Sequence, residues 1–276
     1  MKIRLIADSS ADTLELEGVD FKSVPLTIST NDKDYVDDEN LDVTSMINDL
    51  SLYKGKSSTS CPSTGKWLEA FDGADEIYVV TITSNLSGSY NSANVAKNMY
   101  LEDNPNAKIH IFDSLSAGPE MKLVLEKLRD LIIEGKEFNY IVEEGNKYLS
   151  NTKLYFALES LHNLAQNGRV SKISEIAARI LNIKVLGQAS LQGTLEVMSK
   201  CRGVKKALKG FVDYVFSKYN GGKVRIAHAN NFGFATQIKN AILEKFNKAD
   251  IKIYECRGLC SYYAEEGGVL LGLETV

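Results

Sequence analysis

Apolar residues follow two different spacings along the first half of the chain. Glu76–Thr83 (EIYVVTIT) is a nearly continuous β-branched run, which predicts a strand buried on both faces. Glu120–Glu134 carries leucines at helical spacing and predicts a long helix. The same patterns predict strands at Lys2–Ala7, Phe21–Ile28 and Lys108–Phe112, and helices at Met46–Leu52, Trp67–Phe71 and Ser89–Leu101. Strands that alternate with helices indicate βαβ units and a parallel sheet.

The second half of the chain has a different order of segments. Ile183–Ala189 and Leu195–Ser199 are apolar and are separated by a short connection that contains Gly193, which predicts a hairpin and antiparallel pairing. Helices are predicted at Phe138–Ser150, Ser160–Gln166, Ser174–Leu181, Val204–Tyr219 and Phe234–Phe246, and strands at Lys223–Ala229, Ile251–Tyr254 and Gly268–Leu273. We therefore expect an α/β protein of two domains, 1–150 and 151–276, with the boundary near residue 150.

Composition and charge exclude several classes of protein. The chain has 276 residues, of which 44% are hydrophobic, so it is expected to fold around a core. Its 32 Lys and Arg against 36 Asp and Glu give no basic field for nucleic acid. No apolar run approaches the roughly 18 residues of a membrane span, and the N-terminal segment is typical of a first strand rather than of a signal peptide. We expect a cytoplasmic protein without stable membrane insertion.

Cysteines and histidines do not form a recognisable site. The four cysteines are too scattered for a disulfide framework or a zinc set, and the three histidines lie in separate segments. We expect no metal centre.

Hydroxyl-rich clusters follow the strands of the first half. Asp8–Asp12, Ser84–Ser89 and Asp113–Gly118 each come directly after a predicted strand, and Ser57–Gly65 precedes the helix at Trp67. Any one cluster is typical of an ordinary helix N-cap. Ligands of open parallel sheets bind at the carboxyl ends of the strands, where helix N-termini attract anions. The convergence of four clusters predicts a pocket for a polar or anionic group, to which the backbone at Gly88 would allow close approach.

Motifs for catalysis are missing around these clusters. Gly55-Lys56-Ser57 resembles the end of a phosphate-binding loop, but the upstream glycine that this loop needs is Leu50. Ser87 does not stand in a GxSxG elbow, and no histidine lies in a segment that indicates a base for it. The sequence therefore favours a binding site without catalytic residues.

Two basic stretches have more than one interpretation. Lys200–Lys209 contains five basic residues and no acidic one, which is typical of a solvated helix face but also fits a docking surface for an acidic partner. Arg169, in Gly168–Lys172, could reach a pocket or pair with a carboxylate.

Short motifs along nearly the whole chain resemble those of the DegV family of bacterial fatty-acid-binding proteins. Each motif is short, and their order and spacing together make the resemblance specific. They are Asp8–Asp12, Thr59–Ser63, Ile82–Ala93, Asp113-Ser114, Gly168–Lys172, Ile183-Lys184 and Lys200–Lys206.

The resemblance implies a fold and a ligand. It implies an N-terminal three-layer α/β/α domain with a Rossmann-like parallel sheet, a C-terminal α/β domain with a mixed sheet, and one long-chain fatty acid between them. Its carboxylate would be held by Thr59, Ser87 and the N–H of Gly88. Ser60 and Ser114 stand in the matching hydroxyl motifs and complete the expected set of ligand-binding hydroxyls.

The resemblance to this family also implies a protein partner for this chain. The resemblance implies a monomeric carrier without a cofactor that presents its fatty acid to a separate ATP-dependent fatty acid kinase for phospholipid synthesis. Arg169 and Arg202 match arginines that lie near the head group or at the kinase surface in the family.

This chain departs from the family pattern at two places. Cys61 stands where a glutamine is usual, and Tyr262–Gly268 replaces the usual His-x-Gly-Pro-Gly. Glu265 or Glu266 then falls roughly in the place of the family histidine, where an ionised carboxylate would repel a bound one. Either this glutamate faces away, or it is neutral, or the ligand is bound differently.

Three hypotheses follow for the function. The first is a fatty-acid carrier with no catalysis of its own. The second is an enzyme, either an acyl hydrolase that uses Ser87 or a kinase-like protein acting on a small hydroxylated substrate. The third is an interaction module that senses lipid occupancy through the Lys200–Lys209 face.

Overall fold

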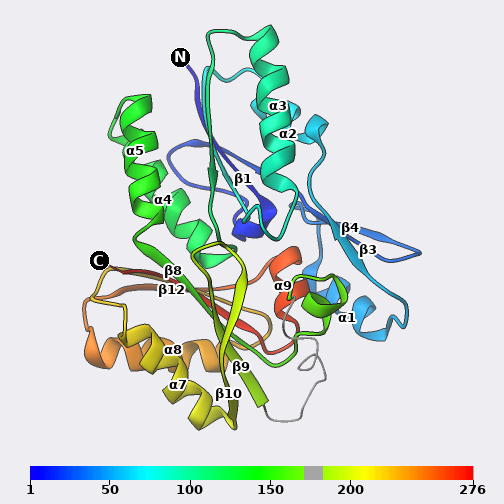
Figure 1. Cartoon of the computed structure of the whole chain (residues 1–276), viewed down its shortest axis with the longest axis vertical. Helices are drawn as coiled ribbons and strands as arrows, with labels where there is room; N and C mark the ends of the chain where they lie inside the picture. Colours follow the sequence, from blue (N-terminus) through cyan, green and yellow to red (C-terminus); the bar gives the residue numbers. More distant parts are fainter. Residues whose placement is uncertain (171–182, 276) are drawn as a thin grey trace.

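Two β-sheets organise the chain, as Figure 1 shows for this computed structural model, which describes residues 1–170 and 183–275. The first sheet has the strand order β2-β1-β6-β7, and all its neighbours pair in parallel. Its strands are β1 (Ile3–Asp8), β2 (Asp20–Val24), β6 (Glu76–Thr81) and β7 (Lys108–Asp113). The parallel sheet predicted for the first half is confirmed.

Helices cover both faces of this sheet. They are α2 (Thr64–Phe71) and α3 (Ser89–Asp103) on one face, and α4 (Pro119–Ile133) and α5 (Phe138–Leu149) on the other. In β6, Ile77 and Val79 pack in the core under α2 and α3, whereas Tyr78 and Val80 pack in the core under α4 and α5. The strand is apolar at every position because helices bury both of its faces.

A small antiparallel sheet stands beside the first one. It has the order β4-β3-β5, formed by β3 (Thr27–Ser29), β4 (Asp34–Val36) and β5 (Ser58–Ser60). Helix α1 (Val43–Leu52) lies between β4 and β5 in the chain. The prediction of one strand over Phe21–Ile28 was wrong, since the segment divides into β2 and β3 in different sheets. Pro25 lies between them, and a proline lacks the N–H that a continuous ladder needs.

The second sheet is mixed and contains the strands of the second half. Its order is β10-β9-β8-β13-β11-β12, with β11 and β12 parallel and the other neighbours antiparallel. The strands are β8 (Thr152–Leu158), β9 (Ile183–Ala189), β10 (Leu195–Arg202), β11 (Lys223–His228), β12 (Asp250–Glu255) and β13 (Val269–Glu274). The predicted β9–β10 hairpin is confirmed, whereas β8 was not predicted.

Two helices pack on one face of the mixed sheet, α7 (Val204–Phe216) and α8 (Phe232–Lys245). Two short helices lie toward the small sheet, α6 (His162–Gln166) and α9 (Gly258–Ala264). The helix predicted at Ser174–Leu181 lies outside the described residues, as do Ser171 and Lys172 of the Gly168–Lys172 motif.

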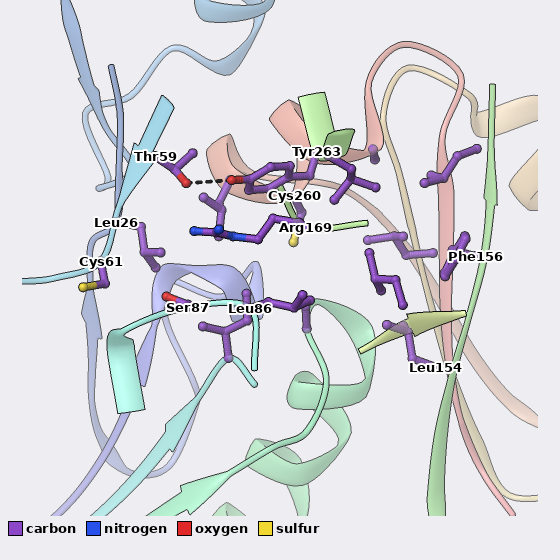
Figure 2. A pocket seen from close by; sticks show the side chains of 18 of the residues that line it. Leu26, Thr59, Cys61, Leu86, Ser87, Leu154, Phe156, Arg169, Cys260 and Tyr263 are labelled. Carbon is purple, nitrogen blue, oxygen red and sulfur yellow. Dashed lines mark hydrogen bonds between the residues drawn. The ribbon is translucent and has the colours of Figure 1, made fainter. Parts of the chain in front are cut away.

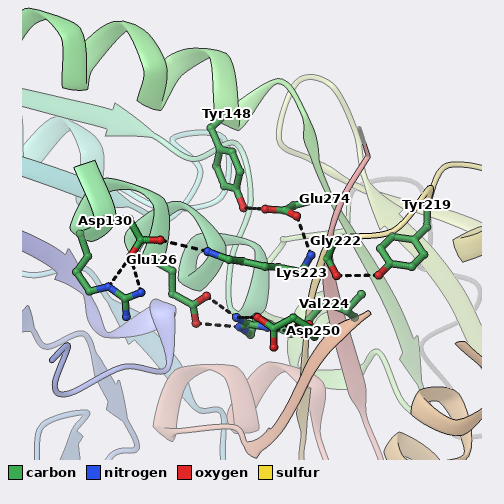
Figure 3. A network of polar contacts seen from close by, with 11 residues as sticks. Glu126, Asp130, Tyr148, Tyr219, Gly222, Lys223, Val224, Asp250 and Glu274 are labelled. Atoms are coloured by element: carbon green, nitrogen blue, oxygen red, sulfur yellow. Dashed lines mark hydrogen bonds and ion pairs between the residues drawn. The ribbon is translucent and has the colours of Figure 1, made fainter. Parts of the chain in front are cut away.

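Helix α4 joins the two sheets (Figure 1). Its apolar side packs in the core of the parallel sheet, and its acidic residues face the mixed sheet. Arg225 on β11 donates to Glu126 through Nε (2.8 Å) and Nη2 (2.6 Å), and both side chains are buried. Thr152 on β8 donates to Glu120 over 2.7 Å. Figure 3 shows the part of this junction around Glu126, together with Asp250 and Lys223.

The boundary near residue 150 stays a prediction. The strands of the parallel sheet precede it and those of the mixed sheet follow it. Within the described residues, no helix combines the length and the apolar character needed to cross a membrane.

Candidate ligand-binding site

A cavity of about 300 Å³ lies between the parallel sheet and the mixed sheet (Figure 2). Both halves of the chain contribute to its wall. The residues that line it are Leu26, Thr59, Ser60, Cys61, Ile82, Leu86, Ser87, Gly88, Ala117, Leu154, Phe156, Leu158, Leu164, Arg169, Leu195, Leu259, Cys260, Tyr263, Ala264 and Leu270. Its wall is apolar except for one group of hydroxyls and a guanidinium, so the cavity is amphipathic.

Thr59, Ser87 and Arg169 form the polar end (Figure 2). Thr59 lies on β5, where it pairs with Ile28 of β3. Ser87 lies in the turn between β6 and α3, where its own N–H donates to the Thr83 carbonyl. The positive charge of Arg169, together with two hydroxyls that can donate, suits an anionic group.

The opposite end of the cavity is built by β8 (Figure 2). Leu154, Phe156 and Leu158 alternate along this strand with Tyr155 and Ala157, which pack under α7 and α8. Successive side chains of a strand point to opposite faces, so one face of β8 lines the cavity and the other packs in the core of the mixed sheet.

Gly187 of β9 fixes the position of the Phe156 ring, which belongs to the β8 wall of the cavity. A Cβ at Gly187 of β9 would lie 2.2 Å from the Phe156 ring, so only glycine leaves the ring its present place.

Gly88, Cys61 and Ser60 also line the cavity. A Cβ at Gly88 would meet the Cys61 sulfur at 3.1 Å, so the absence of a side chain at Gly88 allows the two segments to approach. Figure 2 shows the Cys61 sulfur pointing away from Arg169.

Tyr263 was not predicted, and it reaches the same polar end from α9. Its phenol is hydrogen-bonded to the Thr59 hydroxyl over 2.7 Å (Figure 2). Burial raises the pKa of Tyr263, so the phenol stays protonated at neutral pH and keeps a proton to donate. One feature of the sequence could have indicated Tyr263: it stands in the segment that replaces the usual family motif, next to Tyr262.

Two buried carboxylates of the first half hold the start of α9. Asp37 accepts from the backbone N–H groups of Gly258 and Leu259, each over 2.9 Å, and Asp12 accepts from that of Arg257 over 2.8 Å. The carboxyl oxygens lie where the free N–H groups of the helix point and accept from them, which stabilises the helix start. The contacts of Asp37 and Asp12 therefore hold in place the helix that carries Tyr263. Asp37 was not predicted as a functional residue from the sequence.

The structure places three of the expected ligand residues elsewhere. Ser114 is buried in a local turn, where it donates to the Ser116 carbonyl over 3.0 Å. Arg202 ends β10 with an exposed side chain. Glu265 accepts from the Asn163 N–H at the start of α6 over 3.1 Å. None of these three side chains lines the cavity.

Both glutamates of the departing segment face away from the polar end. Glu265 lies in a separate surface depression together with Glu266. Glu266 is exposed and accepts from the Asn230 amide over 2.7 Å. Of the three possibilities raised by the sequence, the geometry fits a glutamate that faces away.

Among the residues that the structure describes, none forms a nucleophile–base pair with Ser87. Its hydroxyl accepts from the Ser89 N–H over 3.3 Å, and none of His110, His162 and His228 lines the cavity. Within residues 1–170 and 183–275, no three His, Cys, Asp or Glu side chains are grouped as metal ligands would be.

A three-layer unit and a mixed-sheet unit that enclose one amphipathic cavity define a two-domain α/β protein with a site for an amphipathic anion. The chain belongs to the DegV family: the sequence model of this family, described as uncharacterised proteins, matches residues 2–274. A DegV domain-containing protein of Streptococcus pneumoniae is 46% identical over 279 residues, which cover 99% of each chain.

Two crystal structures are similar over nearly the full length. A DegV family protein from Eubacterium eligens, loaded with heptadecanoic acid, is 48% identical with a TM-score of 0.96, covering 99% of this chain and 100% of that one. The Streptococcus pneumoniae Fatty Acid Kinase (Fak) B3 protein, loaded with linoleic acid, is 46% identical with a TM-score of 0.97, covering 100% of both chains. The expected family and two-domain α/β fold are thereby confirmed.

Proposed function

We propose that this protein binds one long-chain fatty acid in the cavity between its sheets. The observation that carries the proposal is the polarity of the cavity wall, which has Thr59, Ser87 and Arg169 at one end and β8 side chains at the other. The carboxylate would lie at the polar end and the acyl chain would follow the apolar wall. The similar proteins from Eubacterium eligens and Streptococcus pneumoniae were crystallised with heptadecanoic and linoleic acid, which supports this ligand class.

The energetics favour a lipid over a small metabolite. Burying a chain of roughly fourteen methylene groups contributes on the order of 10 kcal/mol at ~0.8 kcal/mol each, before the cost of association. A hydrogen bond to a carboxylate contributes about 1.5–3 kcal/mol. The acyl chain therefore sets most of the affinity, and the polar end sets the orientation.

The proposed head-group residues are Thr59, Ser87, the N–H of Gly88, Ser60 and Arg169. Ser114, Arg202 and Glu265 are left out of this set because their side chains lie elsewhere.

Replacement of the two central hydroxyls tests the site. We expect Thr59→Val together with Ser87→Ala to weaken linoleic acid binding by the delipidated protein at least tenfold, measured by calorimetric titration. Ser58→Ala is the matched control, since Ser58 lies on the same strand but does not line the cavity. Equal affinities for the double variant and the control would contradict the proposed site.

We further propose that the protein acts in the cytoplasm as a carrier without catalysis of its own and presents its ligand to a fatty acid kinase. The name of the Streptococcus pneumoniae relative supports this partner, and the exposed Arg202 with the Lys200–Lys209 face offers the kinase a basic surface. Acyl phosphate should form from the bound fatty acid only when both a fatty acid kinase and ATP are added. Turnover of ATP or of an acyl ester by the protein alone would contradict the carrier role.

A further inference from the structure

A hydrogen bond between the two halves of the chain lies inside the head-group site. The Tyr263 phenol and the Thr59 hydroxyl are 2.7 Å apart, and both residues line the cavity (Figure 2). Thr59 comes from β5 of the small sheet, whereas Tyr263 comes from α9. The proposed ligand hydroxyl is therefore already engaged by a side chain 204 residues away.

By geometry either oxygen could donate in this hydrogen bond, and the acidity of the two groups favours one direction. A phenol is a far stronger acid than an aliphatic alcohol, so the phenol is the better donor and the threonine oxygen the better acceptor. Thr59 has a single proton. When its oxygen accepts from Tyr263, that proton is free to be donated to another acceptor.

Tyr263 is held rigidly enough to set the orientation of Thr59. Its ring packs against the edge of Tyr262, with ring centres 4.9 Å apart and an angle of 70° between the planes. The Tyr262 phenol in turn is hydrogen-bonded to Ser57 (2.8 Å) and to the Asn167 amide (2.9 Å). Ser57 and Thr59 are thus both held by consecutive tyrosines of α9, whose first N–H groups are bound by Asp37.

We propose that Tyr263 is a positioning residue for the head group, donating to Thr59 so that the Thr59 proton points to the ligand carboxylate. This inference rests on the proposed fatty-acid binding. A carboxylate can only accept hydrogen bonds, and its charge makes the bond from a donor roughly twice as strong as the bond to a neutral oxygen, whereas an alcohol is neutral and can both donate and accept. A preset donor at Thr59 therefore favours a fatty acid over the fatty alcohol of the same chain, and Tyr263 contributes to this selectivity.

The test compares linoleic acid with linoleyl alcohol at pH 8, in calorimetric titrations of the delipidated protein. We expect Tyr263→Phe to weaken linoleic acid binding roughly three- to tenfold, because one hydrogen bond is lost from the network. Binding of the alcohol should change less than twofold. Tyr219→Phe is the matched control: it removes a buried phenol that donates to the Gly222 carbonyl, and neither residue lines the cavity, so the ratio of the two affinities should stay unchanged.

A double-mutant cycle separates action through Thr59 from direct contact with the ligand. In a Thr59→Val background, Tyr263→Phe should have no further effect on linoleic acid binding. An unchanged acid-to-alcohol ratio in Tyr263→Phe would overturn the proposal, and so would an equal loss with and without the Thr59 hydroxyl. If the parent protein binds neither compound, it is the proposed function that fails.

Discussion

Asp12 is a buried carboxylate at the contact between the two halves. One of its oxygens accepts from the Arg257 N–H, and the other has no hydrogen-bond partner among the described residues. Burial raises the pKa of Asp12 to about 7, with a further contribution from the negative charge of Asp37, although the Arg257 hydrogen bond and Lys122 oppose the shift. The folded protein therefore holds a proton here that the unfolded chain releases near pH 4.

This shift makes stability depend on pH. Because the pKa of Asp12 is higher in the folded state, its contribution to stability is fully present below pH 4 and is lost as the pH rises toward 7. We expect Asp12→Asn to increase the free energy of unfolding relative to the parent protein by about 1–3 kcal/mol more at pH 8 than at pH 5. Urea denaturation at the two pH values measures this difference. An Asp12→Asn effect that is the same at both would contradict the account.

Single residues were predictable where local sequence defines their role. Thr59 and Ser87 stand in hydroxyl clusters next to elements that the pattern predicts, and both line the cavity. Tyr263 and Asp37 act on partners more than 200 residues away, at Thr59 and at the start of α9. Such contacts follow from the packing of the two halves, which no local pattern encodes.

The tip of the β9–β10 hairpin is an element that closes on the first half. Its Gln192 carbonyl accepts from the Asn85 amide over 2.6 Å. Gly193 has a φ of +74°, and a Cβ there would lie 2.2 Å from the Thr83 hydroxyl. Leu195, two residues after Gly193, lines the cavity. The seating of this tip thus helps to keep the wall of the cavity closed.

Gly193→Ala should unseat the tip. We expect it to lower the free energy of unfolding by about 2–4 kcal/mol, from backbone strain together with the clash, and to speed the release of bound linoleic acid. Gly203→Ala is the matched control, since Gly203 has a φ of +84° but no atom of the described residues within 4 Å of a Cβ, so only the strain remains. Equal losses in the two variants, measured by urea denaturation, would show that the tip is not tightly seated.

Most elements with a regular pattern of apolar residues were predictable, including the short α6, whereas β5, β8 and α9 were not. The strand at Glu76, the α4 helix and the β9–β10 hairpin were recovered from spacing alone. Helix α9 has seven residues and begins at Gly258, so its pattern is weak, and its start depends on Asp37. Strand β5 is a run of hydroxyl residues whose extended form comes from pairing with β3, which lies about thirty residues earlier.

At the scale of the whole molecule, a buried ion pair connects the two sheets (Figure 3). Arg225 and Glu126 are 1% and 5% exposed, whereas Asp250, which also accepts from Arg225, is 49% exposed. The two carboxylates therefore differ in how completely water is excluded from them. A buried charge that loses its partner is strongly destabilising, whereas an exposed pair contributes little.

Glu126→Gln should therefore weaken the junction far more than Asp250→Asn. We expect the first change to lower the free energy of unfolding by about 3 kcal/mol and the second by less than about 1 kcal/mol, measured by urea denaturation. Similar losses for both variants would contradict the larger contribution assigned to the buried Arg225–Glu126 pair.

Native mass spectrometry of the protein as purified from cells tests the central claim most directly. The account predicts one tightly held long-chain fatty acid per chain, released on denaturation and identified by its mass. It also predicts that the Thr59→Val and Ser87→Ala double variant retains much less of this lipid than Ser58→Ala does. A chain that carries no lipid and takes up none when fatty acid is supplied, or one that holds a small polar compound in its place, would contradict the account.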